Sequence, residues 1–179
     1  MPNAILDPTG TTKTAGPGAE KAPRARRRAD LHGAAVGLLV NTKQNAAPFL
    51  DEVGRLLAER YGTTVAMART KVNFAQPAPE DLVKEMAASC DVIITGIGDC
   101  GSCSASAVAD GVAFEAAGLP AAVICSDAFR VTADAMAELR GAPGYRYATT
   151  PHPVAVLTPD QVRERAAQVL DDVVALLTA

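Results

Sequence analysis

Two cysteines, Cys100 and Cys103, stand three positions apart in a glycine-rich stretch of the sequence. An apolar run ends just before this stretch and a run with helical periodicity follows it, which predicts a turn from a buried strand into a helix. A thiolate at a helix N-terminus meets unpaired N–H groups and the positive end of the helix dipole, and both lower its pKa. We therefore expect Cys100 to be a nucleophile, with Cys103 able to form a disulfide with it. The alternative is two small residues placed incidentally in a tight turn.

A histidine and a carboxylate accompany the thiols. His152 stands between Pro151 and Pro153, which fix its backbone, and its predicted place on the same edge as the thiols favours an acid–base role or a substrate contact. The alternative is an ordinary hydrogen-bonded loop residue. Asp99 disfavours a thiolate at its neighbour Cys100, so we expect it to orient a proton or a substrate ammonium group.

The elements that must position these residues alternate between two hydrophobic patterns. Short apolar runs predict five buried strands, at residues 34–40, 64–68, 91–97, 121–125 and, more weakly, 145–149. Longer stretches with a period of about 3.6 residues predict helices between and after them; glycines follow three of these helices, and the last begins at Thr158-Pro159-Asp160. This alternation predicts an α/β fold of the doubly wound, flavodoxin-like kind, with a five-stranded parallel sheet in a three-layer α/β/α arrangement.

Ligands of such folds bind beyond the carboxyl ends of the strands, so the residues that follow each strand are the candidates for a site. The predicted substrate-binding residues are Asn41, Thr42, Lys43, Gly98, Gly101, Ser102, Ser104, Asp127, Pro151 and Pro153. Glycines at positions 96, 98 and 101 would let the backbone approach a ligand and present N–H groups to an anion. Lys43, Arg69, Lys71 and Arg130 are each either an anion-binding side chain or a solvated loop charge.

The other two cysteines and the second histidine fit structural roles. Cys90 ends a predicted helix and Cys125 ends an apolar strand, so both are predicted to be buried packing residues. His32 precedes the first strand at the opposite edge of the sheet from the thiols.

Composition narrows the function classes. A chain of 179 residues that is 49% hydrophobic is predicted to hold one domain with a real core. A net charge of -3 and an aromatic content of 4% argue against nucleic-acid binding and against a flavin. No apolar run reaches the roughly 18 residues of a membrane span, and no signal-peptide pattern or disulfide framework is recognisable. We therefore expect a cytoplasmic protein.

Residues 1–30 differ from the rest of the chain. They are rich in Gly, Pro, Thr and Ala without a hydrophobic period, which predicts a mobile N-terminal arm before a single domain at residues 31–179. The arginine cluster at residues 24–28 is typical of a solubilising tail, and contact with nucleic acid or an anionic surface is the alternative.

Together these motifs resemble the UGSC-type (seleno)protein family, whose Sec-Gly-Ser-Cys motif often carries Cys in place of selenocysteine. The matching stretches are Ile5-Leu6-Asp7-Pro8-Thr9, Asn41-Thr42-Lys43, the run from Gly98 to Ser104, and Pro151-His152-Pro153, so the resemblance covers nearly the whole chain. More distantly, the motif resembles the substrate-binding selenoprotein B component of glycine reductase. There the selenocysteine attacks a carbon that bears an amino group and displaces ammonia or an amine. This resemblance implies that Cys100 is the nucleophile and Cys103 the resolving thiol.

These observations favour a Cys-dependent enzyme that cleaves a carbon–heteroatom bond of a small anionic, amino- or thio-substituted metabolite. Lys43 and the amides of residues 98–104 would hold its carboxylate, and His152 would transfer a proton.

One alternative is a thiol–disulfide oxidoreductase that uses Cys100 and Cys103. Others are a zinc site formed by Cys100, Cys103 and His152, and a non-catalytic subunit of a larger complex. The expected partners are the substrate and a thiol reductant or partner subunit; the chain could also form a homo-oligomer. Apart from the zinc alternative, no cofactor is expected.

Overall fold

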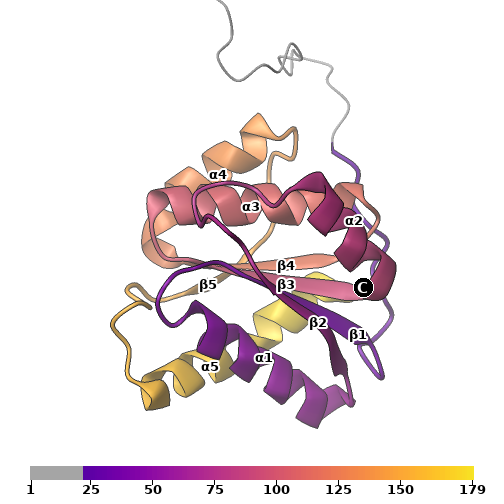
Figure 1. The fold of residues 1–179 in the computed structure, drawn as a ribbon, viewed down its shortest axis with the longest axis horizontal. Coiled ribbons are helices and arrows are strands. Elements are labelled where there is room, and N and C mark those ends of the chain that lie inside the picture. The colour runs from indigo at the N-terminus through magenta and orange to yellow at the C-terminus, as the bar shows by residue number, and fades with distance from the viewer. Residues whose placement is uncertain (1–21) are drawn as a thin grey trace, which may run out of the picture.

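The computed structural model describes residues 22–179, which form an α/β domain of three layers (Figure 1). Five parallel strands lie in the order β2-β1-β3-β4-β5. The strands are β1 (Ala35–Val40), β2 (Thr64–Thr70), β3 (Val92–Gly98), β4 (Ala121–Ser126) and β5 (Ala148–Thr150). The order reverses between β1 and β3, and this confirms the predicted flavodoxin-like fold.

Five α-helices and one short 3₁₀ helix connect and follow the strands. They are α1 (Ala46–Tyr61), α2 (Glu80–Ser89), α3 (Gly101–Ala116), η1 (Asp127–Phe129), α4 (Arg130–Leu139) and α5 (Pro159–Leu177). Helices α1 and α5 cover one face of the sheet, and α2, α3 and α4 cover the other (Figure 1). Each face therefore has its own apolar core, with Phe49 and Leu50 in one and Phe114 and Met86 in the other.

Local sequence explains where the helices begin and end. Gly62 ends α1 in the left-handed region at φ 64°, which a glycine adopts without the strain of a Cβ atom. Thr158 caps α5 in a reciprocal pair of hydrogen bonds with Gln161, as the Thr-Pro-Asp start predicts. Helix α3 begins at Gly101, within the glycine-rich stretch, and Cys100 is its N-cap residue.

Strand β2 departs from the prediction of a doubly buried strand. Its residues are exposed apart from the half-buried Met67, and Val65 keeps 45% of its surface accessible. The reason is its position at the edge of the sheet, where α1 and α2 cover it only in part. An apolar run alone does not distinguish a central strand from an edge strand.

Residues 22–30 also depart from the prediction. The backbone N–H of Ala22 donates to Gly141 O at 2.8 Å, and the buried Ala25 donates its N–H to Glu115 Oε2 at 2.8 Å. Arg28 pairs with Thr178 in a parallel bridge and forms an ion pair with Asp91 at 3.3 Å. The prediction of a mobile arm is therefore wrong for residues 22–30, whose polar groups find acceptors on the domain. Residues 1–21 of that predicted arm lie outside the described residues.

Candidate functional site

Cys100 lies where β3 passes into α3, at the carboxyl edge of the sheet. Its half-buried Sγ accepts the N–H of Cys103 at 3.3 Å and lies 3.5 Å from Ser102 Oγ. Burial acts to raise the pKa of this thiol, but the Cys103 thiol, the Ser102 hydroxyl, the Cys103 N–H and the positive charge of Lys43 together lower it below its ordinary value. The geometry thus favours the thiolate at Cys100, the reactive form of a cysteine.

The pKa of Cys103 is shifted in the opposite direction. Its side chain is fully buried, and burial, followed by its interaction with Cys100, raises its pKa to about 12. Both cysteines are free thiols in the structure. The pair therefore combines an accessible cysteine of lowered pKa with a buried cysteine of raised pKa directly behind it, inside the first turn of α3.

Asp99 and His152 form a hydrogen-bonded pair beside the thiols. His152 Nδ1 lies 2.9 Å from Asp99 Oδ1, while Asp99 Oδ2 accepts the N–H groups of Val154 and Ala155 at 3.0 and 2.9 Å. Burial acts to raise the pKa of Asp99, but these N–H groups and the His152 ring lower it below the usual carboxyl range. Asp99 therefore orients His152 and leaves Nε2 as the ring nitrogen that can exchange a proton with a ligand. Of its two predicted roles, the geometry favours orienting a proton.

Two further contacts hold the half-exposed imidazole of His152. The backbone N–H of His152 donates to Asp127 Oδ1 at 3.0 Å, so Asp127 fixes the loop. The ring of Phe129 meets the imidazole edge to face, with 5.2 Å between ring centroids. Sequence reasoning did not single out Phe129, although it follows β4 at the same edge.

Lys43 is the cation whose positive charge helps to lower the Cys100 pKa. Asn41 fixes its loop, because Asn41 Oδ1 accepts the Lys43 N–H at 3.0 Å and Asn41 Nδ2 donates to Ile97 O at 2.7 Å. Lys43 Nζ lies 4.9 Å from the ring centroid of Phe74, within range of a cation–π interaction. Phe74 was not predicted as a site residue; its only signal is an apolar side chain in a polar loop at the predicted ligand edge.

The other three predicted cations are already engaged. Lys71 is buried and pairs with Asp110 Oδ2 at 2.5 Å, so it is not a solvent-facing anion binder. Arg69 pairs with Glu85 on the surface, and Arg130 donates to Thr149. Within residues 22–179, Lys43 makes no ion pair, which leaves its charge available to an anionic ligand.

The remaining predicted site residues divide between packing positions and the exposed rim. A Cβ atom at Gly98 would lie 2.7 Å from Cys125 Sγ and 2.8 Å from Ser104 Oγ, so close packing already requires glycine there. Ser104 is fully buried and donates to Gly98 O at 2.9 Å, so its hydroxyl is engaged by the protein and does not face the rim. The exposed rim holds Thr42, Ser102, Pro151 and Pro153, with Gly101 half-buried among them.

The cysteines and histidine outside this site occupy structural positions. Cys125 is fully buried, and burial raises its pKa to about 12, as expected of a packing residue. Cys90 is only half-buried, at the margin of the apolar core. His32 packs edge to face on Tyr61.

Within residues 22–179, no three His, Cys, Asp or Glu side chains are arranged to hold a metal ion. Cys100, Cys103 and His152 therefore do not form the three-ligand cluster that the zinc alternative needs.

Comparison with known families agrees with the motif. The UGSC family model matches residues 4–179. The chain belongs to the UGSC family. The match confirms the predicted UGSC resemblance over nearly the whole sequence, including the cysteine motif and the Pro-His-Pro segment. A search of curated proteins found no match to this UGSC family member. The more distant resemblance to the glycine reductase component stays a prediction.

The described helices of this UGSC family member include none with the length and apolar character that a membrane crossing requires.

Proposed function

We propose that this UGSC family member is a Cys-dependent enzyme that reductively cleaves a carbon–heteroatom bond in a small anionic, amino- or thio-substituted metabolite. The observation that carries the proposal is the split between the two thiols: the pKa of Cys100 is lowered at an accessible helix N-terminus, while the pKa of Cys103 is raised to about 12 behind it. A pair built only for packing has no need of this difference.

The first step uses Cys100 and His152. The Cys100 thiolate forms a C–S bond with the substrate carbon, and the bond from that carbon to nitrogen or sulfur breaks. The leaving amine or thiol takes the electron pair of that bond and a proton from His152 Nε2. Asp99, bonded to Nδ1, holds the imidazole in the orientation that this transfer requires.

The second step uses Cys103. It passes its proton to the now neutral His152 and attacks Cys100 Sγ, so that an S–S bond forms and the C–S bond breaks. The carbon keeps that electron pair and takes from His152 the proton that Cys103 passed to it. The substrate carbon is thereby reduced by two electrons while two thiols become one disulfide, and an external dithiol reduces the disulfide for the next cycle.

Binding rests on charge and backbone amides. Lys43 and the N–H groups of the first turn of α3 attract the substrate carboxylate, because a helix N-terminus favours an anion. Among the described residues, the aromatic contacts of Lys43 and His152 are with Phe74 and Phe129, one ring each, which suits a small polar substrate better than a flat cofactor.

The test compares iodoacetate with iodoacetamide, two alkylating agents that differ in a carboxylate. We expect both to modify Cys100 first, as seen by intact-mass analysis and peptide mapping, and iodoacetate to lose its relative advantage in Lys43→Met. Cys100→Ser should abolish the fast adduct, whereas Cys90→Ser should keep it. A fast adduct that persists in Cys100→Ser would contradict the proposal.

A thiol–disulfide oxidoreductase is the second candidate, because an accessible low-pKa thiolate before a buried thiol also suits disulfide exchange. The two candidates differ in their need for His152 and Lys43. Disulfide exchange with a small dithiol should be as fast in His152→Asn as in the wild type. A reductive cleavage that needs proton transfer should lose most of its rate in that variant.

A further inference from the structure

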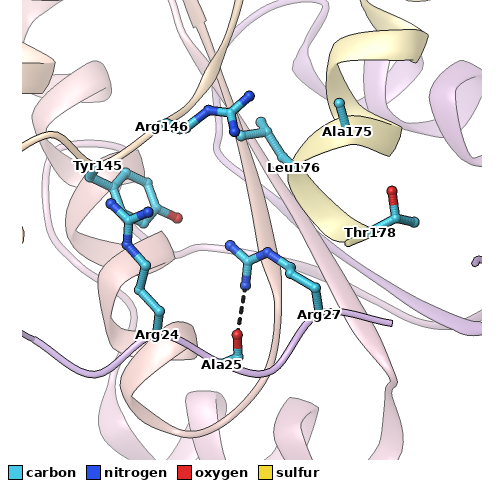
Figure 2. A pocket seen from close by; sticks show the side chains of 8 residues that line it. All are labelled: Arg24, Ala25, Arg27, Tyr145, Arg146, Ala175, Leu176 and Thr178. Atoms are coloured by element: carbon cyan, nitrogen blue, oxygen red, sulfur yellow. Dashed lines mark hydrogen bonds between the residues drawn. The ribbon is translucent and has the colours of Figure 1, made fainter. Parts of the chain in front are cut away.

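A pocket lies near the amino end of β4, whereas Cys100 follows the carboxyl end of β3. Figure 2 shows the side chains that line this pocket. The first residue of β4, Ala121, marks this amino end: its N–H donates to Glu115 Oε1 and its carbonyl accepts the Tyr145 hydroxyl. The pocket has a volume of about 230 Å³. Its lining comes from three segments far apart in the chain: Arg24, Ala25 and Arg27; Tyr145 and Arg146; and Ala175, Leu176 and Thr178.

Three guanidinium groups line this pocket, and they are not equally engaged (Figure 2). Arg27 makes a two-pronged ion pair with the buried Glu115, at 2.9 and 2.8 Å. Within residues 22–179, Arg24 donates only to a carbonyl, Gly144 O, at 3.1 Å. Arg146 is exposed and, among residues 22–179, makes no ion pair or side-chain hydrogen bond. Among the described residues that line the pocket or form ion pairs with its lining, three cations face one carboxylate, a surplus of two positive charges.

The pocket is held in place before any ligand arrives. Glu115 accepts the N–H groups of Ala25 and Ala121 as well as both prongs of Arg27, so it ties residues 22–30 to α3 and β4. Tyr145 is buried, its hydroxyl donates to Ala121 O, and its side chain therefore forms a fixed side of the pocket. A rigid pocket loses little conformational freedom when it binds a ligand.

We propose that this pocket binds a small phosphate-bearing molecule. The surplus of two positive charges matches a phosphate dianion, and the planar forks of Arg24 and Arg146 suit bidentate contact with its oxygens. The volume of about 230 Å³ is below the range of about 300–1,000 Å³ typical of drug-sized ligands, which limits the ligand to a phosphate group with a few further atoms. Leu176 and Ala175 would contact the apolar part of such a ligand.

The test titrates inorganic phosphate into the full chain at constant ionic strength, with sodium chloride as the salt control. Isothermal titration calorimetry should show saturable binding to the wild type. Arg146→Gln should weaken it by about tenfold or more, because a charge-assisted contact contributes about 1.5–3 kcal/mol. Arg26→Gln is the matched control: it removes the same charge from an exposed arginine that lies between Ala25 and Arg27 but does not line the pocket, and it should bind as the wild type does.

Five results of these titrations would contradict the proposal. Absence of saturable binding, or wild-type affinity in both Arg146→Gln and Arg24→Gln, excludes a phosphate site in this pocket. An equal loss in Arg26→Gln shows general charge attraction. Malonate binding as tightly as phosphate shows a dicarboxylate site instead. Lys43→Met should keep phosphate affinity unchanged; a loss there would place the anion at the N-terminus of α3, beside Lys43. The proposal therefore stands or falls independently of the thiol chemistry.

Discussion

The two ends of helix α3 each carry an ionisable side chain, Cys100 at the amino end and Glu115 near the carboxyl end, and their surroundings differ. Glu115 is almost fully buried and accepts four hydrogen bonds from fixed donors. Cys100 is half-buried, with the Cys103 N–H and the Ser102 hydroxyl within hydrogen-bonding range. The Glu115 carboxylate, whose hydrogen bonds are all made within the protein, stabilises the fold. The Cys100 thiol, which is partly exposed to solvent, is available to react with a ligand.

The helix dipole accentuates this difference. The amino end of a helix favours a negative charge, so the thiolate of Cys100 gains from its position without a close ion pair. A carboxylate near the carboxyl end is disfavoured by the dipole, which explains why Glu115 needs the full charge of Arg27.

The largest expected effect is on the free energy of unfolding, which should fall much more when Glu115 is replaced than when Cys100 is replaced. Glu115→Ala leaves Arg27 and the N–H groups of Ala25 and Ala121 without their acceptor, and we expect the free energy of unfolding to fall by about 3 kcal/mol. Cys100→Ser should change it by less than about 1 kcal/mol. Urea denaturation followed by circular dichroism measures both. Equal losses in the two variants would refute the contrast.

The next effect concerns acid stability and Asp99. Its pKa is lower in the folded protein than in the unfolded chain, so its contribution is present above the ordinary carboxyl range and is lost as pH falls through the folded value. Asp99→Asn should therefore be less stable than the wild type at neutral pH, and the difference should shrink as the pH falls below about 4. Thermal melts at several pH values test this, with Asp51→Asn on the exposed face of α1 as the control. A constant difference at every pH would contradict it.

A smaller effect is expected at the amino end of α3 when Lys43 is replaced. Lys43→Met removes the positive charge that helps to lower the Cys100 pKa, so that pKa should rise, and by less than the loss of the Cys103 or Ser102 contact would raise it. The midpoint of the pH dependence of iodoacetamide alkylation should move upward accordingly. Arg69→Met, which removes a charge engaged by Glu85, should leave the midpoint unchanged. A downward shift in Lys43→Met would contradict the electrostatic account.

Sequence alone predicted the parts of the molecule that follow from periodicity and topology. Cys100 and His152 were expected at one edge because the carboxyl ends of parallel strands meet there, and the structure places them there, with Asp99 bonded to the imidazole. The pairing of Asp99 with the loop at Val154 and Ala155 was not predictable, because it depends on how a long connection packs. The docking of Ala25 on Glu115 escaped prediction for the same reason: a segment without periodicity can still satisfy its polar groups on a folded surface.

The smallest expected effect tests whether Phe74 belongs to the thiolate end at all. Its ring lies under Lys43 Nζ, and an exposed cation–π contact contributes about 0.5–1 kcal/mol. In Phe74→Leu the ammonium loses that contact and becomes more mobile, so the preference for iodoacetate over iodoacetamide should change by about two- to fivefold. Val72→Ala is the control, because Val72 is fully exposed in the same loop and has no ring. If Phe74→Leu matches Val72→Ala, the ring only covers the surface, and Lys43 is positioned by Asn41 alone.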